Sequence, residues 1–255
     1  MDEFIASFDS WVVAAALAVA MLGGWGIAWK LGRRHPVDAD DTSGARFVDG
    51  SMALLGLLLG FTFAMALSKH DQRRDMVVIE ANSIGDFATC VAMLKEPARD
   101  QLRPVLREYV QLRLRMGDIR LADPEMNVAI QKTDQLHQRL TGIVSQSIDS
   151  GTPIAVPLVN TLNALVSADA ARMAALRDRL SAAVLMLLFG AAVISTCLVG
   201  RYHGARQKPH VFETVSYIVL VSFAVCVILD LNQPSRGLIR VDDWPLHRLT
   251  ASMAE

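Results

Sequence analysis

Hydrophobic and polar positions are segregated along this chain into four apolar runs separated by charged segments. The runs cover about residues 11–29, 51–68, 180–200 and 211–231. In the second run, about 18 residues at a rise of about 1.5 Å each give about 27 Å, enough to cross the hydrocarbon core of a bilayer. The pattern therefore predicts an all-α integral membrane protein with four transmembrane helices.

The second run passes into charged sequence without a helix-breaking signal. Ser68 is followed by the segment 69–75, which is dense in charge, and apolar residues then recur at Val77, Ala81 and Ile84. This spacing is that of a helix with one apolar face. It predicts one long helix that leaves the membrane and continues into a polar region.

Residues 69–179 form a long insertion between the second and third spans. Its 111 residues hold 15 Lys and Arg against 14 Asp and Glu, and helical spacing is frequent in it. Leucines at helical spacing from Leu158 to Leu180 predict a second helix that runs unbroken into the third span. The expected organisation is spans 1 and 2 in residues 1–68, a helical insertion continuous with spans 2 and 3 in 69–179, spans 3 and 4 in 180–231, and a tail in 232–255.

The composition agrees with a membrane protein and argues against a nucleic-acid-binding or disulfide-rich protein. The chain is 52% hydrophobic, with a mean hydropathy of +0.32 and a net charge of −1. A near-neutral chain has no basic field to recruit nucleic acid. Three scattered cysteines do not indicate a disulfide framework or a metal site. Lipids are the expected surroundings, and no cofactor or metal is expected.

Two stripes follow the second span. Small residues recur every fourth position and would let helices approach closely: Gly56, Gly60, Ala64 and Ser68. An apolar stripe lies beside them: Ala53, Leu57, Phe61 and Met65. Both stripes could be packing faces, or one could line a pore.

Catalytic chemistry is not expected. The interiors of the spans carry no acid, His or Lys, whereas proton-translocating proteins usually place a carboxylate there. Asp169 with Arg172, and Asp71 with Arg74, have the i,i+3 spacing of ion pairs within one helix. Gly-rich phosphate loops and nucleophile motifs are lacking.

Two stretches carry a family resemblance, residues 59–69 with Arg73-Arg74 and 80–85, and the tail segment 230–234 with Asp243-Trp244-Pro245-Leu246. The first resembles the signature of the bacterial bestrophin-like domain family, and the tail resembles the post-membrane segment of bacterial bestrophins. The first is also similar to the pore helix of true bestrophins. The order of elements agrees as well, with two spans, a long helical insertion and two further spans.

The resemblance implies a pentameric ion channel in the bacterial inner membrane, with the termini and the insertion in the cytoplasm. It places Phe61 at a neck phenylalanine, with Leu57 and Ala53 at the two neck positions above it. Met65 extends this lining by one turn. The alternative is a non-conducting membrane scaffold or a stator-like energy-coupling subunit, which shares the layout.

Four charged residues would surround the membrane exit of such a pore. They are Lys69, Asp71, Arg73 and Arg74, three positive charges against one negative charge per copy. A ring of these charges predicts a slight preference for anions among the permeating small ions.

Overall fold

Helices make up every regular element of the described chain. A computed structural model describes residues 9–34, 43–119, 121, 123–207, 210–233, 239 and 241–252. The helices are α2 (Ser10–Arg33), α3 (Ser43–Ala92), α4 (Ala98–Asp118), α5 (Pro124–Asp149), α6 (Ala155–Arg177), α7 (Ala182–Ala205), α8 (Val211–Asn232) and α9 (Trp244–Ser252). The basic residues Lys208, Arg236 and Arg240, which flank the predicted spans, lie outside the described residues.

Four helical segments are long and apolar enough to cross a membrane. They are Ser10–Arg33, Gly44–Ala92, Ala155–Ala205 and Val211–Asn232, and they contain the four predicted runs. The prediction of an all-α, four-span chain is therefore confirmed at the level of length and composition.

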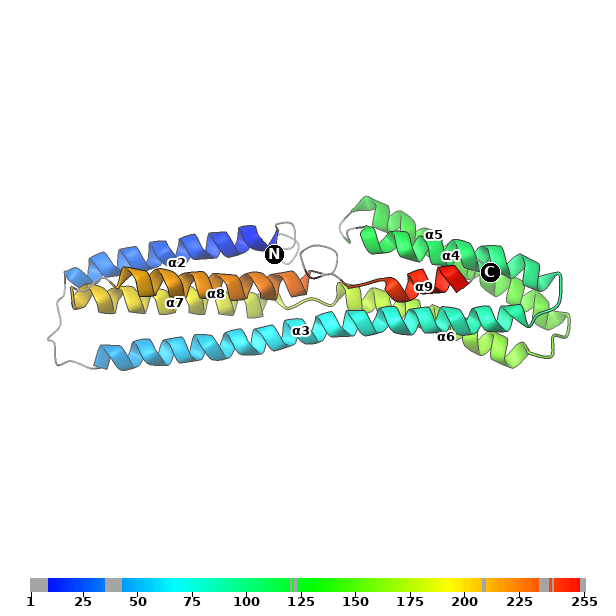
Figure 1. Cartoon of the computed structure of the whole chain (residues 1–255), viewed down its shortest axis with the longest axis horizontal. Helices are drawn as coiled ribbons and strands as arrows, with labels where there is room; N and C mark the ends of the chain where they lie inside the picture. The colour runs from blue at the N-terminus through cyan, green and yellow to red at the C-terminus, as the bar shows by residue number, and fades with distance from the viewer. Residues whose placement is uncertain are drawn as a thin grey trace. The chain divides into compact units, whose positions relative to one another are not determined.

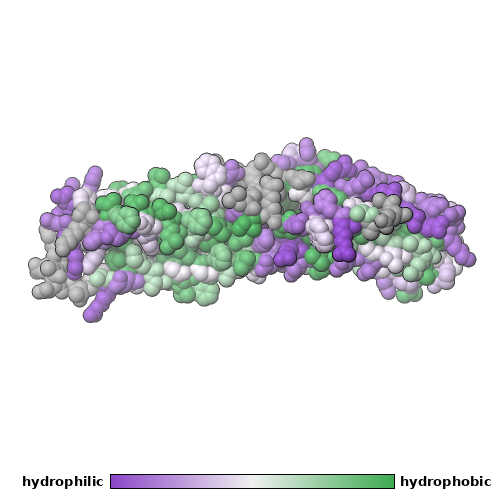
Figure 2. Space-filling model, viewed as in Figure 1, coloured by the Kyte–Doolittle hydropathy of each residue, from purple (hydrophilic) through white to green (hydrophobic). Residues whose placement is uncertain are grey.

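The chain divides into two compact units, each of which has its own core. The membrane unit comprises Met1–Lys69, Arg179–Gln233 and Gly237–Ile239. The polar unit comprises His70–Asp178, Pro234–Arg236 and Arg240–Glu255. In Figure 2 the visible face of the membrane unit is mostly hydrophobic, whereas hydrophilic side chains are frequent on the polar unit.

Helix α3 contributes to both units and is unbroken over 50 residues, as its spacing predicts (Figure 1). In the membrane unit it buries Leu55, Thr62 and Ala66. The Thr62 hydroxyl donates to the carbonyl of Leu58 at 2.7 Å, which satisfies this polar side chain inside an apolar helix.

In the membrane unit, α2 packs along α7 and α8 (Figure 1). Two glycines of α7 set the distance to α2. A Cβ atom at Gly200 would overlap the carbonyl of Trp25, and one at Gly204 would overlap the carbonyl of Trp29. Small residues four apart allow helix backbones to approach this closely in a membrane.

In the polar unit, α3, α4, α5 and α6 bury a common apolar core. Its largest apolar members come from all four helices and include Ile84, Phe87, Leu102, Leu106, Tyr109, Leu136, Leu140, Leu158 and Leu165. Leu246 of α9 is also fully buried in this core. The segment after the fourth span is thereby anchored on the polar unit.

The predicted continuous helix from the insertion into the third span is wrong. Helix α6 ends at Arg177 and α7 begins at Ala182. In the membrane unit the Ser181 hydroxyl accepts from the N–H of Ala183 at 3.3 Å, and Asn232 Oδ1 accepts from the N–H of Leu180 at 2.8 Å. These side chains satisfy backbone donors that an N-terminal helix end leaves open, so the break is stabilised.

The close contact between α2 and α7 gives the first prediction. Gly204→Ala should lower the free energy of unfolding by about 1–3 kcal/mol, because the added methyl group meets the Trp29 carbonyl. Thermal unfolding of the detergent-purified protein measures this change.

Gly190→Ala is the matched control in the same helix, since a Cβ there meets no described atom within 4 Å. Equal stability of the two variants would show that Gly204 does not set the helix distance.

Candidate functional site

The apolar stripe predicted on the second span lies on the surface of this chain. Leu57 is 57% exposed and Phe61 is 62% exposed, and Ala53 and Met65 are exposed as well. These four residues lie in the membrane unit on a face of α3 that the described residues leave uncovered. They are therefore available to a lumen, to lipid or to another subunit.

The small-residue stripe is also uncovered. Gly56, Gly60, Ala64 and Ser68 are all exposed. No atom of the described residues lies within 4 Å of a Cβ built at Gly56 or Gly60. The predicted close helix contact does not form within the described part of this chain, unlike the contact at Gly204.

The charges predicted for the pore exit do not act as one group. Asp71 and Arg74 are exposed and Lys69 is half-buried, but Arg73 is only 2% exposed. Arg73 donates from Nε to the carbonyl of Ala175 at 3.2 Å and from Nη2 to that of Asp178 at 2.8 Å. Its charge is therefore directed at the C-terminal end of α6, a favourable place for a cation, and is removed from the predicted rim.

A buried group of charges occupies the polar unit, and Glu80 of α3 is its centre. The Glu80 side chain is 0% exposed. Arg113 Nε of α4 donates to its Oε1 at 2.5 Å, and Arg172 Nη1 of α6 donates to its Oε2 at 2.5 Å. The hydroxyl of Tyr109 lies 3.4 Å from Oε1. Both carboxylate oxygens are thus held by charge-assisted bonds.

Two further carboxylates complete this group. Arg113 Nη1 lies 2.7 Å from Asp169 Oδ1, and Arg172 Nη2 donates to Asp243 Oδ1 at 2.9 Å. We call Glu80, Arg113, Asp169, Arg172 and Asp243 the ion cluster. It connects α3, α4 and α6 with the segment that leads into α9.

The ion pair predicted between Asp169 and Arg172 is wrong. Each residue bonds instead to partners far away in the sequence, Asp169 to Arg113 and Arg172 to Glu80 and Asp243. Both residues face the core of the polar unit, where tertiary partners replace the neighbour three positions away.

Burial and charge move the pKa values of the cluster in opposite directions. Burial raises the pKa of Glu80, but Arg113 and Arg172 outweigh this effect and the net pKa lies below its usual value. Burial raises the pKa of Asp169 and of Asp243 despite their arginine partners. Glu80 is therefore the firmly ionised member of the cluster.

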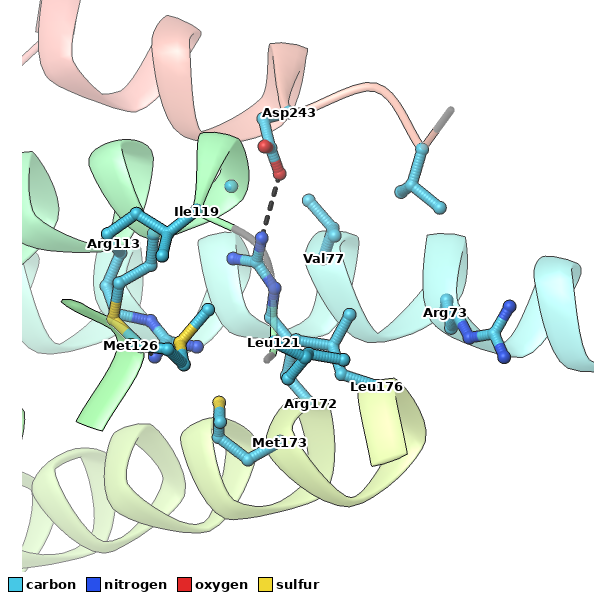
Figure 3. Close-up of a pocket in the computed structure, with 13 residues that line it drawn as sticks. Arg73, Val77, Arg113, Ile119, Leu121, Met126, Arg172, Met173, Leu176 and Asp243 are labelled. Atoms are coloured by element: carbon cyan, nitrogen blue, oxygen red, sulfur yellow. Dashed lines mark hydrogen bonds and ion pairs between the residues drawn. The ribbon is translucent and has the colours of Figure 1, made fainter. Parts of the chain in front are cut away.

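A cavity of about 50 Å³ adjoins the cluster (Figure 3). Arg113, Arg172 and Asp243 line it on the polar side, and Met126 and Leu176 are among its apolar lining residues. In Figure 3 the Arg172 guanidinium points toward Asp243 across this space. Polar walls and this volume suit ordered water.

Among the described residues, no group of three or more His, Cys, Asp or Glu side chains could hold a metal ion. The ion cluster has each guanidinium bonded to two carboxylates, which is a structural arrangement. The sequence signal that could have found it is a charge on an apolar helix face, as at Glu80 between Val77 and Ile84.

Comparison with known proteins identifies the family. The model of the bestrophin-like domain matches residues 11–246, so the chain belongs to the bestrophin-like family. The crystal structure of a mutant bacterial bestrophin homolog from Klebsiella pneumoniae is similar in fold, with a TM-score of 0.61 and 13% sequence identity. That match covers 95% of this chain and 94% of the other. No curated protein matches the sequence.

The motifs that suggested the family are divided between the two units, and residues 73–74, 80–85 and 243–246 lie in the polar unit. Glu80 and Asp243, one from each motif, both bond to Arg172. Leu246, from the tail motif, is fully buried in the core of the same unit. Part of the resemblance therefore lies in residues that hold this unit together.

The central place of Glu80 gives the second prediction. Glu80→Gln should lower the free energy of unfolding of the polar unit by about 3–5 kcal/mol, because two buried guanidiniums lose their shared counter-charge. Limited proteolysis and thermal unfolding of the purified protein measure the loss.

Glu108→Gln serves as the control. Glu108 pairs with Lys132 and Arg139 at the surface, where such pairs contribute less than about 1 kcal/mol. Similar losses in both variants would contradict a central role for Glu80.

Proposed function

We propose that the protein is a homo-oligomeric, bestrophin-like ion channel of the inner membrane, with the membrane part of α3 lining its pore. Family membership and the similar fold support a channel-like membrane protein. We propose the pore helix, the number of subunits and the location of the protein in the inner membrane from the stripes of α3 together with the family resemblance.

One observation carries the proposal. Helix α3 buries Leu55, Thr62 and Ala66 within its own chain, yet leaves Leu57 and Phe61 uncovered one helical turn apart. Copies of this chain arranged around an axis would repeat these two side chains as apolar rings. Such rings hold back water in a narrow lumen and so restrict ion passage.

Ala53 would make this constriction wider at its own level. It carries a methyl group where the family resemblance leads us to expect a bulky side chain. Leu57 and Phe61 are therefore the proposed narrowest part, and Met65 lines the next turn toward the polar unit.

Charge at the proposed exit gives only weak ion selection. Because Arg73 is buried on the end of α6, the rim retains Lys69, Asp71 and Arg74. Asp75, which is exposed and follows Arg74 in the sequence, adds a second negative charge to the rim. The exposed rim charges then sum to zero, so we propose that the rim gives no anion preference, in contrast to the slight preference that the sequence predicts.

Contact between subunits is proposed for the small-residue stripe. Gly56 and Gly60 have open space above them within the described chain, and small residues allow close approach of helices in a membrane. A pentamer follows the family resemblance, with the termini and the polar unit in the cytoplasm.

Phe61→Ala should raise single-channel conductance, because truncating an apolar ring lets water and ions enter the constriction more readily. Bilayer recordings from the purified protein measure this. Phe63→Ala is the matched control, since Phe63 lies two positions along the same helix and points to a different side.

Two results would count against the proposed pore. Equal conductance of both variants would place Phe61 outside the ion path. Absence of current from the wild type and both variants would favour the non-conducting scaffold.

Gly60→Leu should reduce the size of the purified oligomer, because a bulky side chain has no room in a close helix contact. Size-exclusion chromatography with light scattering measures the mass, and Gly60→Ala should have a smaller effect. An unchanged mass for Gly60→Leu would show that the small-residue stripe faces lipid or open space.

A further inference from the structure

The pattern of burial along α3 repeats after about five helical turns, or about 18 residues. Because the helix is unbroken from Ser43 to Ala92, two residues at this spacing lie on the same face of it. Buried residues of its membrane part have buried counterparts at this spacing: Leu55 with Arg73, Thr62 with Glu80, and Ala66 with Ile84. The same spacing therefore assigns each charged residue of α3 to a face that its membrane part defines.

The apolar stripe of the membrane part continues in acidic residues. Its members are followed about five turns later by Asp71, Asp75, Ile79 and Ser83, which correspond to Ala53, Leu57, Phe61 and Met65 in that order. Asp71, Asp75 and Ile79 are exposed, as the four stripe residues are. The continuation of the stripe carries two carboxylates and no basic side chain.

The arginines of this segment lie on other faces of α3. Arg74 follows Gly56 by about five turns, so it continues the small-residue stripe, for which we propose a contact between subunits. Arg73 continues the buried face and donates to two carbonyls at the end of α6. Neither guanidinium shares the face of Leu57 and Phe61.

Lys69 is also on a different face. It is half-buried and follows Ser51 by about five turns. The carbonyl of Ser51 accepts from the Ser195 hydroxyl of α7 at 3.3 Å, so this side of α3 is turned toward its own chain. The basic residues around the proposed exit are thus all removed from the stripe that Asp71 and Asp75 continue.

We propose that Asp71 and Asp75 are the ion-selecting residues of the channel and that they favour cations. The inference rests on the proposed pore, because it takes the face of Leu57 and Phe61 as the lining. In a ring of subunits, each copy would add two carboxylates to the ion path beyond the apolar rings. Rings of acidic side chains select cations in ion channels.

The sum of the exit charges conceals this preference. Lys69, Asp71, Arg74 and Asp75 sum to zero, but only the two carboxylates lie on the lining face. The energy between two charges falls with distance, and salt screens exposed charges beyond about 8 Å. A charge on the lining therefore acts on a passing ion more strongly than a charge directed at a neighbouring helix.

Asp75 is the better of the two positions for a test. It is exposed and forms no ion pair with the described residues, so its substitution leaves the fold intact. Asp71 Oδ1 lies 3.7 Å from Nδ1 of His70, which would offset the Asp71 charge when the imidazole is protonated.

Bilayer recordings from the purified full-length protein in a KCl gradient test the inference. The reversal potential gives the ratio of the K⁺ to the Cl⁻ permeability, and K⁺ should be the more permeant ion in the wild type. Asp75→Asn should lower this ratio by about tenfold, the order of the effect that lining charges have on local ion concentration. Asp134→Asn is the matched control, because it removes an exposed carboxylate of α5 and should leave the ratio unchanged.

Arg74→Gln separates the face of a charge from its sign. If the face decides, this variant should change the permeability ratio much less than Asp75→Asn does. If only the sum of the exit charges matters, the two variants should shift the ratio by equal amounts in opposite directions. That second result would overturn the inference.

The inference and the proposed channel can fail separately. A wild-type current carried mainly by Cl⁻, or a ratio that Asp75→Asn leaves unchanged, would overturn the selection of cations by Asp71 and Asp75 and leave the channel standing. Absence of current from the wild type would contradict the channel itself and, with it, the ion path on which this inference rests.

Discussion

The polar unit depends on the bonds from two arginines to one buried carboxylate. Glu80 has no exposed surface, and each of its oxygens accepts from a different guanidinium. Hydrophobic burial alone would bring α3, α4 and α6 together in many registers. The bonds from Arg113 and Arg172 to one carboxylate fix a single register, because a shift of either helix would leave a charge buried without a partner.

The same helix that carries Glu80 carries the stripes of the membrane unit. Helix α3 presents its buried face to its own chain in both units, through Leu55 and Ala66 in one and Val77 and Ile84 in the other. The face that remains uncovered carries Leu57 and Phe61 in its apolar part. One helix therefore fixes the polar unit and supplies the proposed pore lining, and this division of its faces underlies the proposed function.

The sequence predicts features that depend on local pattern. Length and hydropathy predicted the four spans, and helical spacing from Val77 to Ile84 predicted that α3 continues beyond Ser68. The sequence pattern could not predict features that depend on partners far along the chain. Asp169 and Arg172 have the spacing of a local pair but bond to other helices, and Arg73 turns from the surface to the end of α6. The break before Ala182 depends on Asn232, about fifty positions away, and helical spacing alone does not reveal it.

The proposed function requires that copies of α3 surround an axial pore. A three-dimensional cryo-electron-microscopy reconstruction of the purified protein in a lipid nanodisc tests this arrangement, because it shows both the symmetry and the side chains nearest the axis. We expect a closed ring of subunits in which Leu57 and Phe61 of every copy point at a central opening. A particle without an axial opening, or one in which Leu57 and Phe61 face the lipid, would contradict it.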